Sequence, residues 1–143
     1  MPDRAKRSKE LSVTLGNKIG AGATLFSQLQ ESGINVLASC CYQIGEEALF
    51  TIVPDDSAAA ERVLKANDLE VAAQDVLLVE LANQVGAFAA VLQEISQLRV
   101  SVRSAYVTTT STRSAMGVLK TDNDARVVEA LNQDTPAGGP APA

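Results

Sequence analysis

The sequence contains no histidine and no tryptophan, and aromatic residues make up only 3% of its 143 residues. Histidine is the most common general base and the most common metal ligand, so its absence removes the usual means of acid-base and metal chemistry. No apolar run reaches the roughly 20 residues of a membrane span. The start, MPDRAKRSKE, lacks the apolar segment of a secretory signal. We therefore expect a cytoplasmic protein with no cofactor, no metal site and no membrane partner.

The net charge of the chain is unfavourable for binding nucleic acid. It is -5 at pH 7, and the sequence pI is about 4.7. The first ten residues contain four basic and two acidic side chains. An acidic body is poorly suited to neutralising phosphates, which argues against nucleic acid. We interpret residues 1–9 as a disordered basic arm.

The only two cysteines, Cys40 and Cys41, are neighbours in an apolar segment. If this segment is a strand, the two side chains point to opposite faces, so a disulfide between them would distort it. Buried free thiols are the expectation, and a redox role is the less favoured alternative.

An internal repeat is the most informative feature that is present. At an offset of 66, residues 11–36 (LSVTLGNKIGAGATLFSQLQESGINV) align with residues 77–102 (LLVELANQVGAFAAVLQEISQLRVSV). Repeats reveal units of folding. The identical pairs are Leu11/Leu77, Val13/Val79, Leu15/Leu81, Asn17/Asn83, Gly20/Gly86, Ala21/Ala87, Ala23/Ala89 and Val36/Val102.

Each repeat changes its apolar period from that of a strand to that of a helix. Alternation in 11–15 and 77–81 predicts half-buried strands, and the stripes that follow the glycine turns predict helices. Two further strands, a second helix capped by Asp55 or Asp56 in one repeat and by Asp122 in the other, and a last strand complete the pattern. The order predicts an α+β fold of two tandem ferredoxin-like βαββαβ units with antiparallel sheets, over 10–74 and 75–133.

The second repeat departs from the pattern at its end. Residues 134–143 are rich in Pro, Gly and Ala and predict a disordered tail. This repeat therefore lacks a clear last strand, which leaves a sheet edge unpaired unless another segment fills the position. Since exposed edges pair readily with another copy, we expect a homodimer.

The glycine turn that opens the first helix has three interpretations. A dinucleotide loop would need a third glycine where Leu25 stands, and only Gly20 recurs in the second repeat. A structural role, in which the glycine adopts a backbone conformation closed to other residues, explains the recurrence. The third interpretation is a small-ligand site. Asn17 and Asn35 would flank it, Gly22 would leave space where the second repeat has Phe88, and helix-start N–H groups would attract a carboxylate.

These residues resemble the ACT domain family. The stretch LGNKIGAGATLFSQLQESGINV is similar to the family pattern Asn-(Arg/Lys)-Pro-Gly, a helix, then Gly-(Ile/Val)-Asn-(Ile/Val), and LANQVGAFAAVLQEISQLRVSV is similar to an eroded second copy. Ile19 and Val85 stand at the usual proline. The resemblance covers residues 10–133 and is to small bacterial proteins made of two tandem ACT domains. It implies helices on one side of the sheets.

The resemblance also implies a function. It predicts a non-enzymatic regulatory protein that binds a small molecule, most often an amino acid, at the interface between ACT units, and that acts on a protein partner in trans. The alternative is a structural or interaction module that keeps the fold without binding a ligand. The implied ligand-binding residues are Asn17, Ile19, Gly20, Ala21, Gly22, Asn35, Val36, Asn83, Gly86 and Ser101.

Overall fold

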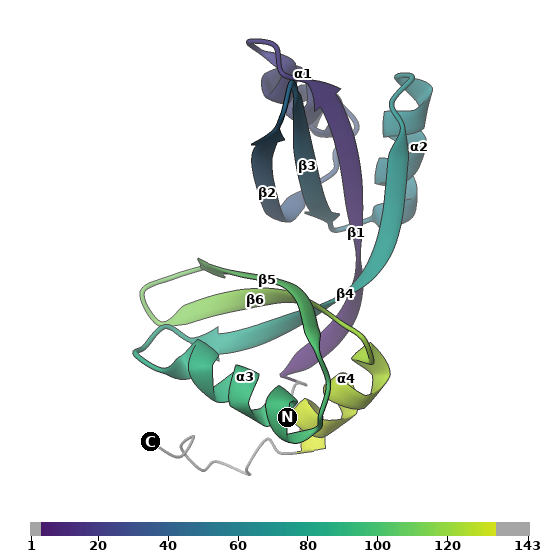
Figure 1. Ribbon diagram of the computed structural model, residues 1–143. Coiled ribbons are helices and arrows are strands. Elements are labelled where there is room, and N and C mark those ends of the chain that lie inside the picture. Colours follow the sequence, from purple (N-terminus) through teal and green to yellow (C-terminus); the bar gives the residue numbers. More distant parts are fainter. Residues whose placement is uncertain (1–3, 134–143) are drawn as a thin grey trace. The chain divides into compact units, whose positions relative to one another are not determined.

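The computed structural model describes residues 4–133 of the chain. It divides into two compact units, Lys9–Gln74, called here the first unit, and Met1–Ser8 with Asp75–Ala143, called the second unit. Both units contain two helices and a sheet (Figure 1). The tail predicted over 134–143 lies outside the described residues.

The first unit has the predicted order of elements. Its strands form a sheet in the order β2-β3-β1, with β4 beside β1. Both β1 and β4 continue beyond the unit, since residues 5–8 and 75–82 belong to the second unit. The elements are β1 (Ala5–Gly16), α1 (Ala21–Glu31), β2 (Val36–Ile44), β3 (Glu47–Pro54), α2 (Ser57–Ala66) and β4 (Val71–Ala82).

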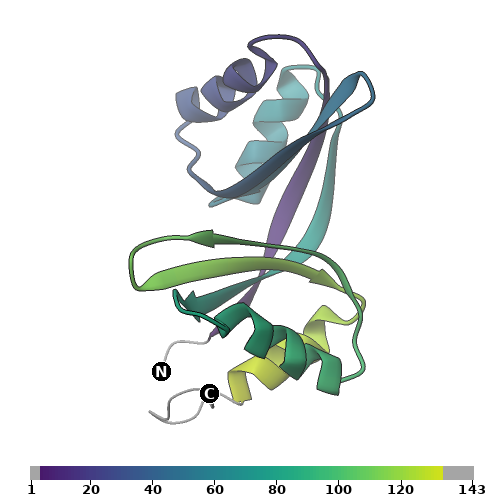
Figure 2. The same ribbon diagram turned by 60° about the vertical axis from the view of Figure 1, so that its left-hand side comes forward.

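One face of this sheet carries the core. Leu11 and Val13, two of the alternating residues of β1, are fully buried with Leu25 and Leu29 of α1 and with Leu64 of α2. Both helices therefore pack on the same face, as Figure 2 also shows. The alternation of apolar residues in β1 and their helical spacing in α1 were enough to predict this core from the sequence.

The second unit repeats the arrangement. The core of this unit contains Leu77 and Val79 of β4, Val91 and Ile95 of α3, and Leu131 of α4. The predicted fold class, α+β with tandem ferredoxin-like units, is confirmed. The further elements are α3 (Ala87–Gln97), β5 (Val102–Thr109), β6 (Ser114–Thr121) and α4 (Asp124–Gln133).

The start of β1 provides the last strand that the second repeat lacks. Glu80 N–H donates to the Arg4 carbonyl at 2.8 Å, which joins β4 to the start of the chain. Ala5 is 1% exposed within the core of the second unit. Asn132 of α4 accepts from the Ala5 N–H at 2.8 Å and donates to the Ala5 carbonyl at 2.9 Å.

The prediction of a disordered arm over 1–9 is therefore wrong for residues 4–9. Alternation in this segment is hidden because Lys6 and Arg7 are exposed while Ala5, which is small, is the buried residue. The edge of β4 in the second unit is filled, so it no longer supports the expectation of a homodimer.

The cysteines also differ from expectation. Cys40 and Cys41 are free, as predicted, but Cys40 is only partly buried and Cys41 is exposed. They lie on β2, which has a single strand neighbour in the first unit, so its side chains have fewer contacts than those of a central strand.

The second helix of each unit has a defined cap. The Asp56 carboxylate accepts from the Ala59 N–H at 3.0 Å and caps α2. At α4 the capping side chain is Asn123, which accepts from the Arg126 N–H at 3.2 Å, and the prediction of Asp122 is wrong. Asp122 instead accepts from the Ser101 N–H at 3.2 Å.

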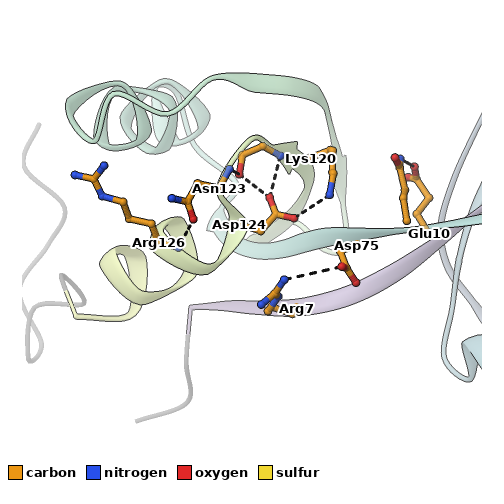
Figure 3. A network of polar contacts seen from close by, with 9 residues as sticks. Arg7, Glu10, Asp75, Lys120, Asn123, Asp124 and Arg126 are labelled. Carbon is orange, nitrogen blue, oxygen red and sulfur yellow. Dashed lines mark hydrogen bonds and ion pairs between the residues drawn. The ribbon is translucent and has the colours of Figure 1, made fainter.

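A buried carboxylate fixes the start of α4. Asp124 is 7% exposed and accepts from the Thr121 N–H at 2.9 Å and from the Lys120 ammonium at 3.3 Å (Figure 3). Elsewhere in Figure 3, Arg7 and Asp75 form a more exposed pair at 4.0 Å. In the part of the chain from 4 to 133, no helix has the length and apolar character needed to cross a membrane.

Candidate ligand site at the start of α1

The turn between β1 and α1 requires a glycine. Gly20 has φ of 88° and Gly86, at the same position of the second unit, has φ of 84°. This left-handed conformation is unfavourable for residues with a Cβ. The structural interpretation of the recurring glycine is therefore correct, and it leaves the N–H groups of the first helical turn free of a side-chain cap in both units.

A pocket of about 440 Å³ adjoins this turn in the first unit. The predicted site residues Ile19, Gly20 and Ala21 line it. Positions 21, 24, 25 and 28 recur at helical spacing, so one face of α1 forms a wall of the pocket. The remaining lining residues are Leu15, Gly16, Lys18, Thr24, Leu25, Gln28 and Leu69.

The pocket combines groups that suit an anion at one end. The first turn of α1 has no side-chain cap: the Ala21 and Thr24 N–H groups donate to the Lys18 and Gly20 carbonyls, which leaves those of Gly22 and Ala23 for an acceptor. Lys18 adds a positive charge to the lining. Helix N-termini with unsatisfied N–H groups are established binding positions for carboxylates and phosphates.

Farther along α1 the pocket contains an unsatisfied acceptor. The carboxamide oxygen Oε1 of Gln28 is buried and accepts no hydrogen bond from any residue between 4 and 133. A buried acceptor without a partner is costly, typically by about 1–3 kcal/mol. Gln28 lines the pocket, so a rotation of its side chain toward the pocket would let this oxygen accept from an N–H donor there.

Gly22 does not enlarge the pocket, contrary to the interpretation from sequence. A Cβ built on Gly22 would lie 3.0 Å from Cζ of Phe50, so the ring of Phe50 already fills the space. In the second unit the ring comes from the helix, as Phe88, and the strand has Gly117, whose Cβ would lie 3.8 Å from Phe88. The two units fill one core position from opposite sides.

Asn17 and Asn35 lie at opposite ends of the first unit. The Asn17 N–H donates to the Glu46 carbonyl at 3.1 Å, at the turn that precedes β3. The Asn35 N–H donates to the Asp55 carboxylate at 3.1 Å, just after β3 ends. The eight residues of β3 separate them by roughly 25 Å. The interpretation that both flank one region is wrong within this unit, and Val36 lies with Asn35 at the far end.

The corresponding residues of the second unit are held by its own backbone. Asn83 Nδ2 donates to the carbonyls of Ser111 and Thr112 at 3.2 and 3.3 Å. Ser101 donates its N–H to Asp122, as Asn35 does to Asp55. Among the predicted residues of this unit, only Gly86 keeps the geometry of the helix start described above.

The family model described as "ACT domain pair" matches residues 7–135 of this chain. The chain belongs to the ACT domain pair family. The comparison with curated proteins returned no match.

Solved structures show the same ACT domain pair fold. Protein BT0572 from Bacteroides thetaiotaomicron is 27% identical with a TM-score of 0.83, and the match covers 91% of this chain and 90% of that one. The ligand-free regulatory subunit of aspartate kinase from Thermus thermophilus is 14% identical with a TM-score of 0.65, covering 90% and 93%. The Thermus flavus regulatory subunit of aspartate kinase is 18% identical, with a TM-score of 0.59 and coverage of 90% and 94%.

Several lining residues of the ACT domain pair were not predicted from the sequence. Lys18, Thr24 and Gln28 all fall on the turn or on the helix face that carries Ala21, so helical spacing alone could have identified them. Local sequence patterns do not indicate Leu69, because it enters the pocket from the loop that joins α2 to β4.

Proposed function

We propose that this ACT domain pair is a non-enzymatic regulatory protein that binds a free amino acid in the pocket at the start of α1. The proposal places the ligand against the first unit. The groups that line the pocket are complementary to an amino acid, since the helix start and Lys18 suit a carboxylate and the oxygen of Gln28 suits an N–H donor. The expectation that a further ACT unit also touches the ligand stays a prediction.

The buried, unsatisfied oxygen of Gln28 carries this proposal. An unpaired buried acceptor beside a pocket lowers the stability of the fold, and in a structural module without a ligand nothing would offset this loss. A bound amino acid would satisfy it and would stabilise the folded first unit.

Regulation would follow from that stabilisation. A ligand that favours one conformation shifts the population toward it, and a protein partner that distinguishes the conformations then acts on the change. The similarity to regulatory subunits of aspartate kinase, which share the fold at 14% and 18% identity, supports a regulatory role acting in trans.

Isothermal titration with each of the twenty amino acids tests the proposal. We expect at least one to bind the wild-type chain and to lose its binding in Thr24→Trp, where an indole on an exposed lining position blocks the pocket. Ser27→Trp is the matched control, because Ser27 is exposed on the same helix and does not line the pocket. Absence of heat with all twenty, or equal loss in both variants, would contradict the proposal.

The alternative, an interaction module without a ligand, has one observation in its favour. Ile19 and Val85 are fully exposed apolar side chains at the same position of the two units, at 108% and 103%. Such side chains suit a protein contact. Thermal shift separates the two functions, because a ligand that binds only the folded state must raise the melting temperature.

We also propose a homodimer, now on different grounds. The outer strand β2 has a single strand neighbour, and two large apolar side chains on it, Tyr42 and Ile44, are 50% and 57% exposed. Edge strands of this kind pair with other chains. Light scattering after size exclusion should give twice the 15.0 kDa mass of the chain, and the monomer mass would contradict the proposal.

A further inference from the structure

The large side chains that line the pocket at the start of α1 are mainly apolar. Leu15 and Leu69 are half-buried, so both keep apolar surface that a ligand can cover, and Leu25 is 1% exposed. Among the described residues of the lining, Lys18 has the only charged side chain and none has a carboxylate. The pocket therefore offers one cation to a ligand and no partner for an ammonium group on the ligand's side chain.

Ile19 is fully exposed although it belongs to this lining. Its side chain is 108% exposed, whereas the leucines of the lining are buried or half-buried. Removal of an aliphatic side chain from water is favourable. A ligand with apolar atoms in the pocket would give Ile19 a surface on which to pack.

The turn that carries Ile19 is held by fewer side-chain contacts than its counterpart in the second unit. There, Nδ2 of Asn83 donates to two carbonyls of the hairpin between β5 and β6, at 3.2 and 3.3 Å. Asn17 has the same position in the first unit, and its carboxamide forms no hydrogen bond with any residue from 4 to 133. The turn also begins at Gly16, where the second unit has Ala82. Small residues often serve as hinges, so the turn of the first unit is the one suited to closing.

The second unit also lacks the cation. Gln84 occupies the position of Lys18 in the internal repeat. The guanidinium of Arg4 lies nearer to α3, but its Nη2 donates to both carboxylate oxygens of Glu94, at 2.9 and 3.0 Å. A carboxylate at the start of α3 would therefore have no unpaired cation beside it of the kind that Lys18 provides.

Building on the proposed function, we infer that the pocket selects an amino acid with an aliphatic side chain and that Ile19 closes over this side chain. The α-carboxylate binds at the helix start beside Lys18. The side chain then lies on Leu15 and Leu69, and Ile19 covers it from the turn.

Charged side chains are excluded by the same lining. The ammonium of a lysine ligand would leave water without meeting a carboxylate, which is costly. A second carboxylate, as in glutamate, would compete with the α-carboxylate for Lys18, the single cation of the lining. An aliphatic chain loses no hydrogen bond to water when it enters, and each carbon gains burial.

Calorimetric titration with a series of straight-chain amino acids tests this inference. From L-alanine through L-2-aminobutyrate and L-norvaline to L-norleucine, each methylene should tighten binding by about fourfold. L-lysine has the carbon chain of L-norleucine and a terminal ammonium, so we expect it to bind at least tenfold more weakly. Tighter binding of L-lysine, L-glutamate or L-serine than of L-norleucine would overturn the inference.

Variants of the turn assign the closing contact to Ile19. Ile19→Ser should weaken L-norleucine by roughly fivefold to tenfold and leave L-alanine within about twofold, since only the longer ligand reaches this side chain. Val85→Ser makes the same kind of change at the matching position of the second unit, where the side chain is 103% exposed, and should behave as wild type. In the methyl-labelled wild-type chain, a nuclear Overhauser effect should connect Ile19 with the side chain of bound L-norleucine.

The outcomes separate this inference from the proposed function. If a charged or polar amino acid binds and the aliphatic series does not, the side-chain preference is overturned and the proposed function stands. Unchanged L-norleucine affinity in Ile19→Ser would overturn the closing contact and would favour a protein contact for Ile19. If none of the twenty amino acids binds, the proposed function fails and this inference fails with it.

Discussion

At the scale of single residues, the turn after the first helix of each unit has one residue in the left-handed backbone conformation. After α1 the chain turns through Gly33 with φ of 72°, and after α3 the same turn is made by Arg99 with φ of 60°. In this left-handed conformation glycine is favoured because it has no Cβ. The second unit therefore has a locally unfavourable residue at a turn whose hydrogen bonds, such as Val100 N–H to the Ile95 carbonyl, match those of the first unit.

Replacing Arg99 with glycine should stabilise the chain. We expect Arg99→Gly to raise the free energy of unfolding by about 0.5–1 kcal/mol, because removal of the Cβ relieves the left-handed strain. The reverse control, Gly33→Ala, should lower it by about 1 kcal/mol. Urea unfolding followed by circular dichroism measures both. A destabilised Arg99→Gly would show that the arginine side chain makes a contribution larger than the strain.

At the scale of elements, local patterns predicted most of the structure and non-local contacts set the limit. Alternation and helical spacing are properties of neighbouring residues, so the helices and the strands around Leu11 and Leu77 could be read from the sequence. The last strand of the second unit comes from the start of the chain, more than 70 residues before β4 ends. Prediction of the site from the sequence was limited in the same way. Phe50 of β3 fills the space beside Gly22 of α1, and no local pattern indicates this contact.

In the first unit the helix has the glycine and the strand has the aromatic ring, and in the second unit the two are exchanged. Mutations that copy this exchange test the packing. Gly22→Phe alone should destabilise the first unit by about 1–3 kcal/mol, since the new ring meets Phe50. Phe50→Gly alone should also destabilise it, by leaving a cavity. The double variant copies the arrangement of Phe88 and Gly117, so it should be more stable than the sum of the two changes predicts. Additive values in a double-mutant cycle would contradict the exchange.

At the scale of the whole molecule, the chain's first described residues belong to its second unit. This makes the stability of the second unit depend on residues 4–8. Ala5→Glu should therefore destabilise it by about 2–4 kcal/mol, because a charge would replace a buried methyl group.

Lys6→Glu is the control for that change, since Lys6 is the exposed neighbour in the same strand and should alter stability by less than about 0.5 kcal/mol. Hydrogen exchange followed by mass spectrometry assigns the effect to a unit. Faster exchange in α3 and α4 with Ala5→Glu is the expected result. Equal exchange in the two variants would show that the start of the chain does not complete the second unit.

We propose that the first unit binds an amino acid at the start of α1 and that the second unit does not. Amide chemical shifts of the isotope-labelled chain, recorded by NMR while the amino acids are added one at a time, test it most directly. We expect at least one amino acid to shift the amides of Lys18 to Gln28 at saturation and to leave those of Gln84 to Glu94 in place. Shifts confined to Gln84–Glu94, or none with any of the twenty, would contradict it.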